Sequence, residues 1–318
     1  MTDDLSLALS YCEATAAPDD RIACFDVEAS RRGDVVRLSG TVSSHDLRRR
    51  AVEVLSQVSD RPVDASGVAV LSRGEERTVS VPCAAVRKAP DSDAERVTSA
   101  LYGATLGAYD REGDWRRIRT PCGYLGWVEE DILSIPTSIA PVAVLTRPVT
   151  AGSGTTLPAG ADCAIHGREG GEATVVFRTG REATLPTDSV TVPRADATGA
   201  DVVTTAESFL GTEYRWGGMS HEGIDCSGLV WIAYRTVGIT MPRDADQQRA
   251  MGREVDRGAL RPGDLLFSPG HVAISRGGSS FVHARGSAGT VVVNDLDPDE
   301  EGYLADLDEG FERATRVL

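Results

Sequence analysis

The chain has 318 residues, enough for roughly two to four domains, and 41% of them are hydrophobic, so a packed core is feasible. Its net charge of −15 would repel phosphate backbones, so we expect no nucleic-acid partner. No apolar run approaches the roughly 18–20 residues of a membrane span, and the N-terminus lacks the basic start of a secretory signal. We therefore expect a cytoplasmic protein without a membrane partner. We also expect a monomer, although the sequence itself does not give the oligomeric state.

Residues 1–72 are interpreted as a small α/β region. A helix is predicted over 3–16, followed by strand, helix and strand over 34–71, with Ser44 as the cap of the second helix. The apolar positions that define the helix faces are Leu5, Leu9 and Cys12 in the first helix, and Leu47, Ala51, Val54 and Val58 in the second. We interpret this region as a scaffold that packs on its neighbours.

The sequence pattern of residues 73–136 differs from that of the preceding region. Short alternating segments are separated by Gly, Pro and Asp turns, which is typical of a small β-barrel. The spacing of "GDW" to "GW" resembles bacterial SH3-like domains. Residues 137–196 contain a weaker set of strands, which predicts a second SH3-like barrel. A last domain is expected over 197–318, and the overall fold class is α+β.

The six cysteines do not form a recognisable ligand or redox pattern. Because no C-x-x-C pair occurs, zinc ribbons and thioredoxin-type sites lose support, and we expect neither a metal nor another cofactor. Free thiols are favoured in a chain of this length without a signal peptide. A disulfide between Cys83 and Cys122, across one small domain, remains the alternative.

Cys226 stands at the start of an amphipathic segment. The run "LVWIAYRTVG" has apolar residues at helical spacing and ends at Gly238, and Asp225 can cap its start. Cys226 then lies in the first turn, where the helix dipole and free N–H groups favour a thiolate, the nucleophilic form. The alternative is a buried cysteine that only packs.

Two histidines in the same domain can supply a base. His271 and His283 lie in strand-like segments, and a hairpin with a five-residue loop over 275–279 would pair them directly on one face. One imidazole could take the thiol proton while the other holds its tautomer and orientation. The same residues could instead ligate a metal, although no fourth ligand is evident, and His221 is an alternative base.

At this point the motifs resemble a known family. The segments "GTEYRWGGMSHEGIDCSGLVWIAY", "MPRDADQQ", "RPGDLLFS", "HVAIS" and "FVHA" are similar, in order, to the NlpC family of papain-like cysteine peptidases that act on cell-wall peptides. The resemblance implies a papain-like catalytic domain in which Cys226 is the nucleophile, His271 the base and His283 the orienting residue. Tyr214 would flank the nucleophile and, with the Cys226 N–H, face the oxyanion.

The domain order resembles one subgroup, the γ-D-glutamyl-L-diamino-acid endopeptidases, which degrade murein-derived peptides. In that subgroup the first SH3-like domain restricts the site to peptides with a free N-terminal L-Ala. The matching substrate-binding positions in this chain are Tyr214, Trp216, Asp225, Ser227, Asp244, Glu95 and Tyr124. Each has an ordinary alternative: Glu95 as a surface charge, Tyr124 as a core residue, Asp225 as only a helix cap. Ala245 departs from the serine usual in the subgroup.

The resemblance therefore implies a murein-type peptide as substrate. Two other functions stay open at this point: an inert module that binds cell-wall peptides, and a thiol amidase or acyltransferase with the same triad. The acidic run over 294–310 is interpreted as solvated surface.

Overall fold

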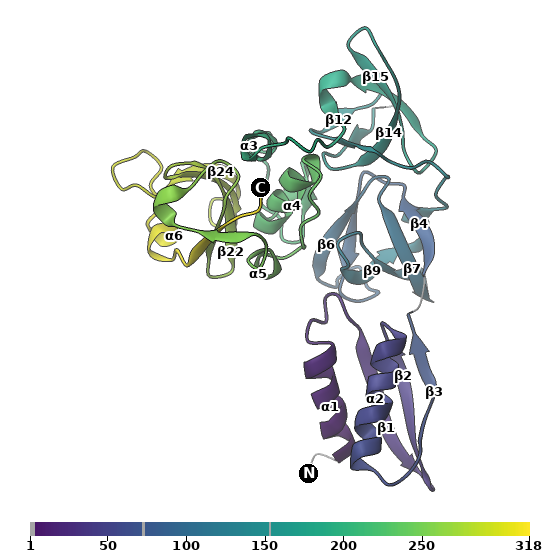
Figure 1. The fold of residues 1–318 in the computed structure, drawn as a ribbon. Helices are drawn as coiled ribbons and strands as arrows, with labels where there is room; N and C mark the ends of the chain where they lie inside the picture. The colour runs from purple at the N-terminus through teal and green to yellow at the C-terminus, as the bar shows by residue number, and fades with distance from the viewer. Residues whose placement is uncertain (1–3, 72–73, 153) are drawn as a thin grey trace.

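The computed structural model describes residues 4–71, 74–152 and 154–318 (Figure 1). An N-terminal α/β unit and two small β-barrels are stacked in a column, and the C-terminal helix-and-sheet domain lies beside that column. None of the helices in the described part of the chain has the length and apolarity of a membrane span. The expected α+β architecture, with SH3-like barrels before a papain-like domain, is confirmed.

The N-terminal unit is a three-stranded sheet with two helices on one face. Its elements are α1 (Asp4–Ala16), β1 (Phe25–Arg32), β2 (Val35–Val42), α2 (His45–Val58) and β3 (Val63–Val70). Helix α2 connects β2 to β3, which pair in parallel, so this is a β-α-β unit. As predicted, Ser44 caps α2, and its Oγ accepts a hydrogen bond from the Leu47 N–H at 3.2 Å.

Two features of this unit differ from the sequence prediction. Strand β1 was not predicted, because most of its residues are polar and it is exposed over much of its length. Val58 was placed on the apolar face of α2, but it is the last helical residue and is 45% exposed. Leu55, almost one turn earlier, is fully buried and completes the core face instead.

Each barrel is built from short antiparallel strands. The first contains β4 (Glu75–Val79), β5 (Cys83–Arg87), β6 (Arg96–Leu101), β7 (Thr105–Glu112), β8 (Trp115–Arg119), β9 (Leu125–Glu129) and β10 (Leu133–Ser134). The second contains β11 (Ala143–Leu145), β14 (Asp162–Glu169), β15 (Glu172–Val176), β16 (Glu182–Pro186) and β17 (Val190–Thr191), with a small hairpin of β12 (Val149–Thr150) and β13 (Thr156–Leu157). Each encloses its own hydrophobic core.

The C-terminal domain packs helices on a six-stranded sheet of order β20-β25-β21-β22-β23-β24. The strands are β20 (Arg253–Val255), β21 (Leu265–Ser268), β22 (His271–Gly277), β23 (Ser280–Arg285), β24 (Thr290–Asp295) and β25 (Arg313–Arg316). The helices are α3 (Gly199–Glu207), α4 (Cys226–Thr236), α5 (Ala245–Gln248) and α6 (Ala305–Glu309), and β18 (Met219–Ser220) pairs with β19 (Gly223–Ile224).

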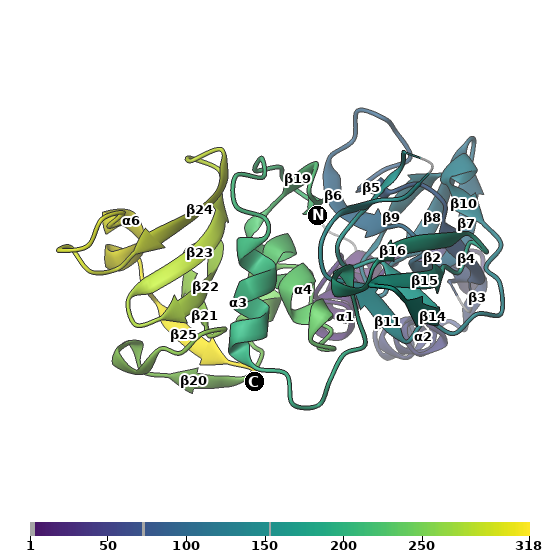
Figure 2. The same cartoon turned by 90° about the horizontal axis from the view of Figure 1, so that it is seen from above.

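Helix α4 is enclosed from two sides. Figure 2 shows it between the sheet with α3 on one side and the barrels on the other. Arg235 of α4 donates to the carbonyl of Gly160 in the second barrel at 3.1 Å and pairs with Asp162. Gly160 has a φ of +81°, which favours glycine, and a Cβ there would lie 2.7 Å from Ile232 Cδ1. The barrels therefore pack on the face of α4 that does not contact the sheet.

Candidate active site

Cys226 is the first residue of α4. As predicted, Asp225 caps this helix, and its Oδ1 accepts the Gly228 N–H at 2.7 Å. Cys226 is 8% exposed. The backbone N–H groups of Val272 and Ser227 hydrogen-bond its sulfur and act to lower its pKa. Val272 follows His271 directly in β22, so the start of that strand lies against the thiol.

The two predicted histidines are joined in a chain of hydrogen bonds. His271 Nε2 lies 2.8 Å from His283 Nδ1, and His283 Nε2 lies 3.0 Å from Oδ1 of Asn294 in β24. Asn294 Nδ2 donates to the carbonyl of Gly302 at 2.8 Å, which fixes the orientation of the amide. The array therefore has a further member, Asn294, that the sequence reasoning did not single out.

The predicted register of this hairpin is wrong. Ile274 pairs with Val282 and Gly277 with Ser280, so the turn is shorter than the five residues predicted. Strand β22 contains a bulge at Arg276, just before this turn. The strand partners differ by two residues from the prediction. A shift of two keeps every side chain on its face of the sheet, because side chains alternate with period two. The histidines are therefore diagonal neighbours on one face and still touch.

These bonds assign the tautomers. With its oxygen facing His283, Asn294 can only accept, so His283 carries its proton on Nε2 and presents a lone pair on Nδ1. His271 then donates from Nε2, which leaves its Nδ1 unprotonated. That nitrogen is the one free to take a proton from a thiol.

The ionisation of the site is set by burial. Burial raises the pKa of Cys226 to about 11, with the nearby charge of Asp225 adding to the effect. Burial lowers the pKa of His271 to about 3, helped by His283, and that of His283 to about 4. The expectation that the helix start favours a resting thiolate is therefore outweighed. Burial thus favours the neutral form of the thiol and of both imidazoles.

Tyr214 lies beside the nucleophile. It packs half-buried against the core that includes Cys226, and a Cβ on Gly286 would lie 3.4 Å from its ring. Burial, and then the charge of Cys226, raises the pKa of its phenol to about 12. The phenol is therefore a proton donor throughout the neutral range, as an oxyanion partner must be.

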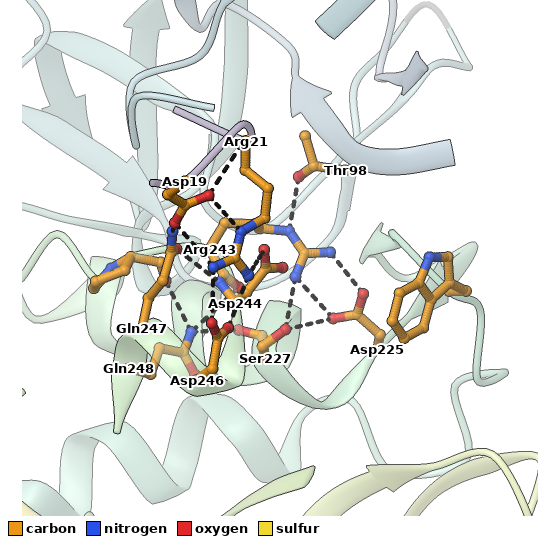
Figure 3. A network of polar contacts seen from close by, with 12 residues as sticks. Asp19, Arg21, Thr98, Asp225, Ser227, Arg243, Asp244, Asp246, Gln247 and Gln248 are labelled. Carbon is orange, nitrogen blue, oxygen red and sulfur yellow. Dashed lines mark hydrogen bonds and ion pairs between the residues drawn. The ribbon is translucent and has the colours of Figure 1, made fainter. Parts of the chain in front are cut away.

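Asp225 is held in a buried ion pair with Arg243 (Figure 3). Arg243, 1% exposed, donates to both carboxylate oxygens at 3.0 and 2.7 Å, to Ser227 Oγ at 2.8 Å and to Thr98 Oγ1 of the first barrel at 2.7 Å. Asp225 also accepts from the N–H of Gly217 at 2.8 Å. These donors, with the cap bond, use the acceptor capacity of Asp225, so its evident role is to position the segments on either side of Cys226.

The first barrel reaches the same region through Glu95. The indole N–H of Trp216 donates to Glu95 Oε1 at 2.9 Å. Gly217, with φ of +70°, allows this approach, since a Cβ there would lie 2.7 Å from Cγ and 2.8 Å from the carbonyl oxygen of Arg96 in β6. Trp216 is 61% exposed, so its indole remains open to a ligand.

Tyr124 and Glu95 line one cavity of about 350 Å³ at the edge of the first barrel. Tyr124 is buried, and burial together with the charge of Asp244 raises its pKa. Asp244 caps α5, and burial raises its pKa as well. Ala245, the first residue of α5, packs against the core that includes Cys226. Of the predicted substrate-binding residues, Tyr214 therefore lies near Cys226, while Glu95 and Tyr124 line a cavity whose lining comes from the N-terminal unit and the first barrel.

The other cysteines form no disulfide. All six are free thiols, so the alternative pairing of Cys83 with Cys122 is wrong. Both residues instead pack against the core of the C-terminal domain, at its contact with the first barrel. The alternative base His221 lies in the turn between β18 and β19, and its Nδ1 is buried with no hydrogen-bond partner among the residues described.

Comparison with known proteins now assigns the domains. Residues 211–304 match the NlpC/P60 family, and residues 84–134 match the bacterial SH3 domain. The chain carries an NlpC/P60 cysteine-peptidase domain. Cys226, His271 and His283 all lie within this NlpC/P60 match, whereas Glu95 and Tyr124 lie within the SH3 match.

Relatives with this domain are named peptidases. Dipeptidyl-peptidase 6 of Lysinibacillus sphaericus is 44% identical over 34% of this chain and 40% of its own length. The gamma-D-glutamyl-L-lysine dipeptidyl-peptidase of Bacillus cereus is 28% identical over 70% of this chain and 75% of its own. A crystal structure of an NlpC/P60 family protein from Bacillus cereus covers 77% of this chain and all of its own, with a TM-score of 0.65 and 23% identity, which shows a shared fold.

Proposed function

We propose that this protein hydrolyses the amide bond between γ-D-Glu and a diamino acid in murein-derived peptides that carry a free N-terminal L-Ala. The observation that carries the proposal is the hydrogen-bonded array of His271, His283 and Asn294, together with the Cys226 sulfur that is hydrogen-bonded to the N–H of Val272, the residue after His271. The names of the two relatives support the bond and the dipeptide product. We place the reaction in the cytoplasm and assign it to a monomer.

In the proposed reaction His271 Nδ1 takes the thiol proton as Cys226 sulfur attacks the carbonyl carbon of the γ-D-Glu residue. Because both partners are neutral at rest, transfer accompanies attack. The oxyanion forms near the Cys226 N–H, which is free of helix bonding at this first position, and near the Tyr214 phenol. His271 then protonates the leaving amine, an acyl-enzyme remains, and water attacks it with His271 as base.

The residues around Glu95 support the proposed restriction to a free N-terminus. Glu95 can pair with an ammonium group, and the exposed indole of Trp216, which donates to Glu95, adds aromatic surface beside it. The cavity that Glu95 and Tyr124 line also carries the cations Arg21, Lys88 and Arg117, so the ammonium is assigned to the Glu95 side. Asp225, whose oxygens are used by other donors, holds Ser227 and the Trp216 segment in place. Asp244 stands beside Tyr124 and adds negative potential.

The test uses defined peptides. Purified protein is incubated with L-Ala-γ-D-Glu-L-Lys and its diaminopimelate analogue, and release of L-Ala-γ-D-Glu is followed by mass spectrometry. We expect cleavage by the wild type and by Cys163→Ala, which alters a thiol in the second barrel, but not by Cys226→Ala. Cleavage of the α-linked isomer at the same rate, or equal cleavage by Cys226→Ala, contradicts the proposal. Binding without cleavage would favour the inert module.

A further inference from the structure

The N-terminal unit reaches into the peptidase domain through the loop 17–24, between α1 and β1. Arg21 in this loop donates to three carboxylates, those of Asp19, Asp244 and Asp246, at 2.7–2.9 Å (Figure 3). These five bonds use all five N–H groups of the guanidinium. Two of the carboxylates stand at the start of α5, so one arginine clamps the N-terminal unit to the peptidase domain.

Further bonds surround this clamp. Gln247 Nε2 of α5 donates to Asp19 Oδ2 at 2.7 Å. The N–H of Leu125 in the first barrel donates to the carbonyl of Arg21 at 2.7 Å, and Leu125 also packs with Cys24 and Leu71 in a small apolar cluster. The loop is thus held by the first barrel and the peptidase domain at once.

The loop also forms part of the cavity that contains Glu95 and Tyr124. Asp20 and Arg21 line it together with those two residues. Glu95 is bonded to Trp216, two residues from Tyr214 beside the nucleophile, and Tyr124 senses the charge of Asp244, a partner of Arg21. The volume of about 350 Å³ lies near the lower limit of ligand pockets, roughly 300 Å³. In a cavity of this size, the side chains of Asp20 and Arg21 take up a substantial part of the wall, alongside those of the first barrel.

We propose that the loop 17–24 is a specificity element that forms one wall of the substrate cavity, so that only the end of a short, free peptide is admitted. This role rests on the proposed function, and it adds the N-terminal unit, which lies outside both matched domains, to the residues that select the substrate. The Arg21 clamp holds the wall in place. Without Arg21, three neighbouring carboxylates would repel one another and release the loop.

The experiment compares full-length Arg21→Ala with Arg37→Ala, an exposed arginine on β2 of the same unit. For each, kcat/KM is measured on L-Ala-γ-D-Glu-L-Lys and on the same peptide acetylated at its amino group. The ratio of kcat/KM for the free peptide to kcat/KM for the acetylated peptide measures the discrimination. We expect this ratio to fall about tenfold or more in Arg21→Ala, the effect of losing one pocket contact, and to stay at the wild-type value in Arg37→Ala. Asp20→Trp, which fills the cavity, should raise KM for the free peptide.

A second readout does not depend on hydrolysis. The rate of Cys226 alkylation by iodoacetamide and by a bulky fluorescein maleimide is followed by peptide mass spectrometry. Loss of the wall should raise the bulky-to-small rate ratio in Arg21→Ala, even if the wild type cleaves neither peptide and the proposed function fails. Wild-type values of both the acetylation ratio and the alkylation ratio in Arg21→Ala, with an unchanged melting temperature, would overturn the inference.

Discussion

The resting charge of Cys226 can be measured directly. With a pKa of about 11, only about one thiol in ten thousand is ionised at pH 7. A thiolate stabilised by the helix start and a protonated histidine would instead be fully formed there. The two cases therefore differ by nearly the whole absorbance of one thiolate at 240 nm.

The assay is the absorbance difference between the wild type and Cys226→Ser, titrated from pH 5 to 10. Because burial of the thiol dominates, we expect the difference to stay flat below pH 9 and to rise only above it. Subtracting the serine variant removes the five other thiols and the tyrosines. A rise in the absorbance difference with a midpoint below pH 8 would refute the neutral thiol and imidazole. It would instead support a Cys226 thiolate stabilised by the start of α4.

Three further predictions follow from the same geometry. Asn294→Ala should lower kcat about fivefold in a steady-state assay, because one hydrogen bond contributes about 1 kcal/mol. Asn294→Asp keeps the acceptor for His283 and should keep most of the rate. Equal losses of kcat in the two variants would contradict this role. Arg243→Met should cost about 3–5 kcal/mol in urea unfolding, because it leaves Asp225 buried and unpaired, and a loss below about 1 kcal/mol would contradict this. Both active-site histidines have lowered pKa values, so the unfolded chain binds more protons than the folded one as pH falls below 6.5. Stability should therefore decline as pH falls from about 6 towards 4, by at most about 1 kcal/mol per pH unit for each histidine and by less near pH 4, where His283 takes up its own proton; His271→Ala should flatten the decline.

Local sequence patterns were sufficient to predict the position of Cys226 and the helix that begins with it. Asp225, Cys226 and Gly238 each have a local physical role in starting or ending α4, and the structure places all three accordingly. The histidines were placed on one face from spacing alone. That conclusion survived a wrong register because the error was an even number of residues.

Long-range contacts were not predictable in this way. Asn294 follows three valines in the next strand, and a polar residue at that point is the available signal. Its place at the head of the acidic run 294–310 favours a solvated surface instead. Arg21 is joined to Asp244 across 223 residues, and nothing in the local composition of either segment indicates the other. The ionisation of Cys226 also depended on burial by distant elements, which opposed the helix-start effect visible in the sequence.

Ala245, where the chain departs from the subgroup it resembles, is flanked on both sides by residues that the N-terminal loop binds. Ala245 lies between Asp244 and Asp246, the two carboxylates that Arg21 holds. A change of side chain at this position therefore acts on a wall that already contains part of another unit. The methyl group of Ala245 and the Arg21 clamp should be coupled in their effect on substrate choice, since they share neighbours on either side. An Ala245→Ser substitution is thus informative only when it is measured both with and without Arg21, as a double-mutant cycle.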